Sequence, residues 1–417
     1  MVAGLAMHCL LPSILVVSRL QVARFSIHPG AALVIAGLIS LILLKRDDIR
    51  VFAERWLECT AALIGLAALG VVHGVTTGGA PSLGFAFDQI VVPMCAVFVI
   101  GVELTADPGK WTRLRDGILA IAAVEGVYAS LQARQNSPIL FAEALSEQAW
   151  FGTASEVRWM GSLDHPLVLA VILATAMPLL ATVRRWYVVF PLMVIYFSGI
   201  LATESRAGLL AIAGTAAYAL LRGRTSPRSK SVLILASVGF VAFALQSGMV
   251  DGALERFVTG EASTQARVKA ADYFFSILDQ YLWLGEGLEM SFRVAAGGGL
   301  TTSFENSVFM TIVDMGLPSA LFYYGLMIAL LVTGLVRRSM PGFVIGGVVT
   351  LIQITTFSAL GVRSAAALWI WVVAAGAAFS PRHAPPARRI LPSAPPTSVF
   401  AAEPPPAAED LTRKVPA

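Results

Sequence analysis

The chain has 417 residues, of which 57% are hydrophobic and 13% are charged, and its mean hydropathy is +0.75. Soluble domains carry about 25% charged residues, so this chain lacks the polar side chains that a water-facing surface needs. Its net charge of +4 comes from basic residues in short loops between apolar segments, a pattern that reports membrane orientation and not nucleic-acid binding.

Apolar segments of about 20 residues, long enough to cross a bilayer, recur along most of the chain. We expect helices over the ranges 3–22, 29–44, 57–76, 87–105, 116–133, 165–183, 186–203, 207–221, 231–250, 307–336, 342–361 and 364–380. The sequence therefore predicts an all-α fold, a polytopic integral membrane protein with about twelve transmembrane helices.

Lysine and arginine concentrate in alternate loops between these segments, which indicates the side that faces the cytoplasm. The loops hold Lys45, Arg46 and Arg50; Lys110, Arg113 and Arg115; Arg184 and Arg185; Arg222, Arg224, Arg228 and Lys230; and Arg337 and Arg338. The opposite loops are then extracytoplasmic, at 77–86, 134–164, 204–206, 251–306 and 362–363.

The composition divides the chain into two parts. Residues 1–380 form the predicted transmembrane domain, and its large outer loop, 251–306, contains an amphipathic helix that we expect along the membrane surface. Ten of the 22 prolines fall in 381–417, which predicts a disordered cytoplasmic tail. The three cysteines and five histidines show no metal-ligand spacing, so we expect no metal site and no cofactor.

Two clusters of charge stand out at the expected outer face, and each has a purely structural alternative. Arg206 opens a helix two residues after Glu204. Arg206 could anchor its helix among lipid headgroups, and Glu204 could mark a tight turn. Arg267 and Lys269 stand at the start of the amphipathic stretch, where they could bind anionic headgroups.

Two further pairs lie where outer loops enter apolar segments. Glu305 and Asn306 precede one such segment, and Asn306 is one of only two asparagines in the chain. Asparagine is a favoured helix cap, but capping does not require the neighbouring glutamate. Arg158 and His165 bracket the stretch RWMGSLDHP, in which His165 could simply start a helix.

Glu125 and Asp314 fall within predicted spans. An ionisable group there costs about 2.5–3.5 kcal/mol on insertion scales, so each needs a partner or a function. For Asp314 we consider a pair with an arginine inside the bundle.

Together, the charged residues at the expected outer face are suited to one kind of reaction. Two guanidiniums at one surface can grip a phosphate or pyrophosphate through paired hydrogen bonds. A nearby carboxylate can take the proton of a sugar hydroxyl as a general base. Glycosyl transfer from a polyprenyl-pyrophosphate donor needs both, and arginine can neutralise the leaving group without a metal.

Four motifs follow one another between residues 155 and 335. They are RWMGSLDHPLVLA; the RxxxL pattern of Arg206-Ala-Gly-Leu-Leu210; Arg267 followed by an aromatic-rich helix and Gly285-Glu286-Gly287; and ENSVFMTIVDMGLPS, which keeps Asn306, a nine-residue gap, Gly316 and then Ser319. In their order and spacing these motifs resemble the O-antigen ligase and Wzy-type polysaccharide polymerase superfamily.

The resemblance implies a GT-C-like helical fold and metal-independent transfer of a lipid-linked glycan at the periplasmic face of a bacterial inner membrane. By position, Arg206 and Arg267 would bind the pyrophosphate, and Glu305 would stand where the ligases carry a catalytic histidine. The remaining candidates for substrate binding are Arg158, His165, Lys269 and Asn306.

The replacement of histidine by Glu305 favours a polymerase of undecaprenyl-pyrophosphate-linked repeat units, because Wzy-type polymerases are the more variable at this position. A ligase that moves finished glycan to another acceptor is the nearest alternative. A transporter or flippase of an anionic substrate belongs to another class, but its usual inverted repeats are not evident here. The expected partners are the lipid-linked oligosaccharide, the bilayer and other polysaccharide export or chain-length proteins, with no nucleic acid.

Overall fold

The computed structural model describes residues 1–19, 27–77, 80–146, 158–248, 250 and 261–382. All regular structure in these ranges is helical, as the sequence predicted. The tail predicted to be disordered lies, from residue 383 onward, outside the described residues, as does the 251–260 part of the outer loop.

The first part of the chain forms α1 (Val2–Leu10), α2 (Ser13–Arg19), α3 (Pro29–Leu44), α4 (Arg46–Arg55), α5 (Leu57–Thr77), α6 (Ala80–Ala86), the π-helix η1 (Phe87–Val91), α7 (Val92–Ala106), the 3-10 helix η2 (Pro108–Lys110), α8 (Trp111–Gln135) and α9 (Ala142–Ser146). The second part forms α11 (Pro166–Ala176), η3 (Met177–Thr182), α12 (Trp186–Ala202), α13 (Arg206–Arg222), α14 (Pro227–Gln246), α16 (Glu261–Ile277), η4 (Leu278–Tyr281), α17 (Ser291–Gly297), α18 (Ser307–Met315), α19 (Leu317–Val336), α20 (Pro341–Ile354) and α21 (Ala366–Phe379).

Breaks divide two segments that the sequence predicted as continuous helices. The first ends at Leu10 and resumes at Ser13, because Pro12 cannot donate a backbone hydrogen bond within a helix. The second is interrupted at Gly316, whose φ of 83° lies in the left-handed region that favours glycine. The helix α4, which the hydropathy pattern did not predict, bends by 99° from α3.

Helix length bears on how many segments cross a membrane. Among the described residues, four helices are long and apolar enough, at 57–76, 82–106, 227–246 and 317–336, or five if α3 and α4 form one broken span. Other apolar helices are shorter; α20 and α21 have 14 residues each, about 21 Å against a hydrocarbon core of about 30 Å. The count of about twelve spans stays a prediction.

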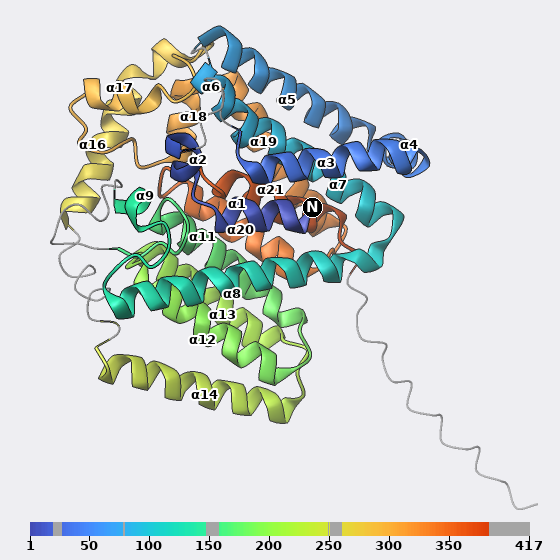
Figure 1. Cartoon of the computed structure of the whole chain (residues 1–417), viewed down its shortest axis with the longest axis vertical. Coiled ribbons are helices and arrows are strands. Elements are labelled where there is room, and N and C mark those ends of the chain that lie inside the picture. The colour runs from blue at the N-terminus through green and yellow to red at the C-terminus, as the bar shows by residue number, and fades with distance from the viewer. Residues whose placement is uncertain (20–26, 78–79, 147–157, 249, 251–260, 383–417) are drawn as a thin grey trace, which may run out of the picture. The chain divides into compact units, whose positions relative to one another are not determined.

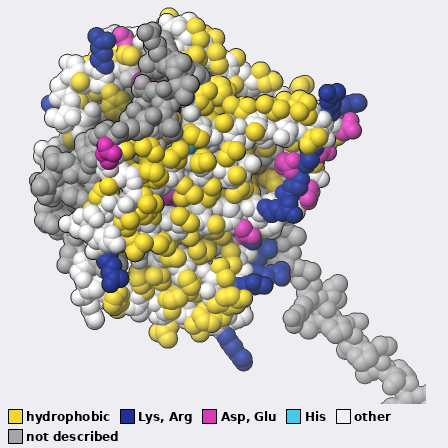
Figure 2. All heavy atoms as spheres, in the orientation of Figure 1, with side chains coloured by type: hydrophobic (Ala, Val, Ile, Leu, Met, Phe, Trp, Pro, Cys, Tyr) yellow, Lys and Arg dark blue, Asp and Glu magenta, His cyan; other side chains and the backbone are white. Residues whose placement is uncertain are grey.

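Figure 1 shows how the helices are arranged within residues 1–382. The outer-loop helices α16 and α17, together with α18, lie toward the left of the view, whereas α4 and the α7–α8 and α13–α14 junctions lie toward the right. Three loops that the basic residues assigned to the cytoplasm therefore share one side. Hydrophobic side chains cover much of the visible face in Figure 2, with charged side chains mainly at its edges.

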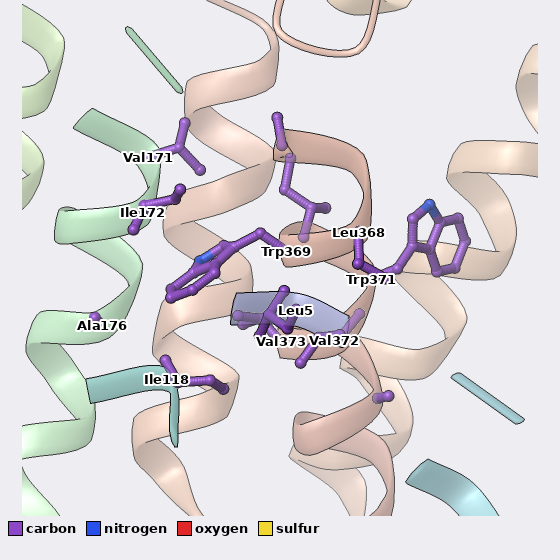
Figure 3. Packing of buried hydrophobic residues seen from close by; sticks show 14 of the residues in the cluster. Leu5, Ile118, Val171, Ile172, Ala176, Leu368, Trp369, Trp371, Val372 and Val373 are labelled. Carbon is purple, nitrogen blue, oxygen red and sulfur yellow. The ribbon is translucent and has the colours of Figure 1, made fainter. Parts of the chain in front are cut away.

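The helix α21 forms the centre of the core. Every residue from Ala366 to Phe379 is buried, as expected of a helix that is apolar on all sides. Figure 3 shows Trp369 and Trp371 pointing to opposite sides of this helix. Their indole N–H groups donate to Thr175 Oγ1 and Tyr323 OH, both at 2.7 Å, so the polar atoms of the two largest core side chains are satisfied.

Candidate functional site

Aromatic side chains pack α16 against α18 and so position the outer segment of the chain. The ring of Phe274 stacks on that of Phe309, with centroids 4.0 Å apart and an interplanar angle of 6°. Tyr273 lies parallel to Phe304 at a centroid distance of 6.0 Å. Each such pair contributes about 0.5–1.5 kcal/mol beyond the burial of its area. Arg267 lies about two turns before Phe274 on α16, so this packing carries it toward the start of α18.

The packing brings together two of the three predicted catalytic residues. Arg267 Nε lies 3.9 Å from Glu305 Oε2, and the two side chains are 42% and 25% exposed. The other carboxylate oxygen, Oε1, accepts a hydrogen bond of 3.0 Å from Thr302 Oγ1. Arg267 forms no hydrogen bond with the residues that the structure describes, so within these ranges its guanidinium N–H groups are available to a ligand.

Glu204 and Glu305 share an unusual backbone position. Their φ angles are 51° and 53°, in the left-handed region, and each directly precedes the cap residue of a helix. Ser205 accepts from Gly208 N at the start of α13; Asn306 accepts from two backbone N–H groups of α18, which confirms the predicted asparagine cap. A non-glycine residue in a rare conformation costs of order 1–3 kcal/mol, and such residues cluster at ligand clamps and active sites.

The glycines of two separate motifs contact each other's backbone. A Cβ on Gly285 would lie 2.2 Å from the carbonyl of Asp314, and one on Gly316 would lie 2.6 Å from Trp283 O. Gly287 N also donates to Asp314 O at 3.1 Å. The Gly285-Glu286-Gly287 turn therefore packs directly against the end of α18, and only glycine lets the two backbones come this close.

Glu125 and Asp314 both have hydrogen-bond partners. Asp314 accepts from the backbone N and hydroxyl of Ser291, at 2.7 and 3.2 Å, and so caps α17. Among the described residues no arginine pairs with Asp314, and Ser291 is its partner instead. Glu125 accepts from Ser162 N at 3.0 Å and Ser162 Oγ at 2.5 Å, which fixes the turn inside RWMGSLDHP.

That turn lies directly against the start of α13. Arg158 Nε donates to Thr203 O at 2.9 Å, and Trp159 N donates to Ala202 O at 3.1 Å. Arg158 is therefore next to the segment that presents Arg206. Arg206 is half-buried and makes no hydrogen bond or ion pair with the residues described. Unlike Arg267, it therefore has no charged partner among these residues.

His165 caps α11 through Nδ1, which accepts from Leu167 N at 3.0 Å. Because Nδ1 accepts this hydrogen bond, the neutral imidazole carries its proton on Nε2.

The structure does not bring all the candidate site residues into contact with one another. Arg206 forms no ion pair with Glu305, and Lys269 is exposed and forms none with the described residues. Sequence reasoning also missed an ion pair between Arg363 and Asp88, whose side chains are 12% and 1% exposed. Two features of the sequence could have indicated this ion pair: Asp88 lies inside a predicted span, and Arg363 lies in the two-residue outer loop 362–363.

A comparison with models of protein families tests the resemblance that the sequence motifs suggested. Residues 191–324 match the Wzy_C family model, described as O-antigen ligase. This stretch is a Wzy_C region. It runs from within α12 to within α19 and contains Arg206, Arg267, Glu305 and Asn306. The resemblance to the O-antigen ligase and Wzy superfamily is thereby confirmed.

The Wzy_C match, with the apolar helices, indicates a multi-pass membrane protein that contains a region similar to O-antigen ligases. Arg158 and His165 lie before the matched residues. No curated protein and no solved structure gives a match.

Proposed function

We propose that the chain is an integral-membrane glycosyltransferase that polymerises undecaprenyl-pyrophosphate-linked oligosaccharide repeat units at the periplasmic face of a bacterial inner membrane. The observation that carries this proposal is the contact of 3.9 Å between Arg267 and Glu305 inside the Wzy_C region. It sets a cation able to bind phosphate beside a carboxylate able to take a proton, and both side chains are open to solvent.

The proposed reaction needs one proton transfer and one displacement. Glu305 takes the proton of the acceptor hydroxyl, whose oxygen attacks the anomeric carbon of the donor sugar. A new glycosidic C–O bond forms, and the bond from that carbon to the pyrophosphate oxygen breaks. Undecaprenyl pyrophosphate leaves with the electron pair, and the Arg206 and Arg267 guanidiniums stabilise its charge without requiring a metal.

The remaining candidates take supporting roles in this proposal. Arg158 binds the 202–203 backbone and adds positive charge next to Arg206. His165 caps α11 and so fixes the start of that helix, and Lys269 adds a cation to the exposed surface of α16. Asn306 uses its side-chain oxygen to cap α18, so its part is to hold Glu305 in place.

A ligase that transfers finished glycan is the second candidate, and the O-antigen ligase description of the matched family favours it. Analysis of the surface polysaccharide in a deletion strain separates the two. Loss of chain length with retention of single repeats is the expected result for a polymerase. Intact polymer stranded on its carrier lipid would assign the chain as a ligase, and an unchanged polysaccharide would contradict both.

A further inference from the structure

A cavity of about 350 Å³ lies between α1, α3, α7 and α8, and none of its lining residues belongs to the Wzy_C region. Its volume falls within the range of about 300–1,000 Å³ typical of ligand pockets. The wall is mainly aliphatic, formed by Val2, Leu41, Val99, Ile100, Leu104 and Leu114. Such a space suits a hydrocarbon chain and not ordered water, which needs polar partners.

One end of the cavity is charged. Lys45, Lys110 and Arg113 line it together with a single carboxylate, Glu103. Both lysines form ion pairs with Glu103, that of Lys45 at 2.7 Å. Arg113 is exposed and forms no ion pair or hydrogen bond with the described residues. Three cations around one carboxylate leave a surplus of positive charge at the mouth of an apolar space.

The cavity opens at the side of α3. Leu44 is 82% exposed and Ser40 is also exposed, yet both line the cavity. Gly37 lines it as well, and a Cβ added there would meet no atom within 4 Å. In Figure 2, acidic and basic side chains gather beside hydrophobic surface at the right edge, the side on which α4 and the α7–α8 junction lie in Figure 1.

We propose that this cavity binds an anionic phospholipid of the cytoplasmic leaflet, with an acyl chain against the aliphatic wall and its phosphate at Lys45, Lys110 and Arg113. The basic loops place this end of the helices at the cytoplasmic surface, where anionic headgroups attract lysine and arginine. Basic pockets between membrane helices on that side suit such headgroups. The bound lipid would join α1, α3, α7 and α8 at the end where they enclose a void.

The test uses the purified full-length chain in mild detergent, titrated with phosphatidylglycerol or phosphatidylcholine and followed by native mass spectrometry and thermal unfolding. Phosphatidylglycerol should bind the wild-type chain more tightly and raise its unfolding temperature more. Arg113→Gln should weaken phosphatidylglycerol binding about five-fold, the ratio expected when one lipid-facing cation is lost, and should weaken phosphatidylcholine binding less, because the choline cation offsets the charge of its phosphate. The matched control is Arg184→Gln, an exposed arginine of another basic loop, which should bind like wild type.

The apolar part of the site has its own pair of variants. Gly37→Leu should fill the cavity and abolish binding of both lipids. Gly239→Leu, in α14, also places its side chain in open space but away from the cavity, and should bind like wild type. Equal affinity for the two lipids would overturn the proposal, even if Gly37→Leu reduced both, because the cavity would then take any acyl chain. Wild-type binding by both Gly37→Leu and Arg113→Gln would also overturn it. Because Arg113 is exposed and unpaired, its variant remains informative if Gly37→Leu fails to fold.

Discussion

Replacing Glu305 by glutamine separates a general base from a structural ion pair. The amide oxygen can still accept the hydrogen bond from Thr302, and the helix cap at Asn306 is untouched. Two unit charges 3.9 Å apart, as in the Arg267–Glu305 contact, attract by about 1 kcal/mol in water, and exposed pairs measure about 0.2–1 kcal/mol. Loss of the pair alone can therefore change a rate by at most about five-fold. Loss of a general base costs about 10²–10⁴-fold.

The assay is the initial rate of glycan transfer by the reconstituted chain, with lipid-linked repeat units as both donor and acceptor. We expect Glu305→Gln to lower this rate at least 100-fold, while its amount in membranes and its unfolding temperature stay near wild type. Glu204→Gln is the matched control, because Glu204 has the same left-handed backbone and also precedes a helix cap, and its rate should stay near wild type. A Glu305→Gln rate within five-fold of wild type would refute the general base, as would an equal loss in Glu204→Gln.

Three further predictions concern the cations, the glycine contact and the membrane orientation. Arg206→Ala and Arg267→Ala should each slow glycan transfer about 10²–10³-fold and leave lipid-linked single repeats in cells. Lys269→Ala is the control and should retain most activity. Normal polymer length in both arginine variants would exclude pyrophosphate binding by these residues. Gly285→Ala should lower the unfolding temperature, because its Cβ would lie 2.2 Å from the Asp314 carbonyl, and Gly297→Ala, with nothing within 4 Å, should not; equal temperatures would contradict the glycine contact. In a chain whose three native cysteines are replaced, Arg206→Cys should react with a membrane-impermeant thiol reagent that is added on the periplasmic side. Reaction only with reagent on the cytoplasmic side would reverse the orientation.

Hydropathy predicted the helices well because apolar composition over about 20 residues is a local property. It missed α4, since the charged stretch Arg46–Arg55 forms its helix with no apolar run to signal it. It also joined α18 to α19, because a single glycine does not interrupt an apolar run. The break at Gly316 depends on the close approach of Trp283, which comes from a distant part of the outer loop.

The candidate site shows the same division between local and distant information. Charge and spacing identified Arg267 and Glu305, but their contact depends on stacking between rings of α16 and α18, which no local pattern encodes. The cap at Asn306 was predictable because its partners lie two and three residues away. The partner of Asp314 was not, since Ser291 lies in another helix and looks unremarkable in sequence.

The glycine contacts between the 285–287 turn and the end of α18 have a mechanical consequence. The stacked rings hold α16 against the start of α18, and the glycine contacts hold the 285–287 turn against its end, so the guanidinium and the carboxylate would move together as one block. Admitting a bulky sugar chain then calls for displacement of this block relative to its neighbours. The Ser307 hydroxyl donates to Phe357 O and accepts from Leu360 N. These two hydrogen bonds connect the block to the segment between α20 and α21.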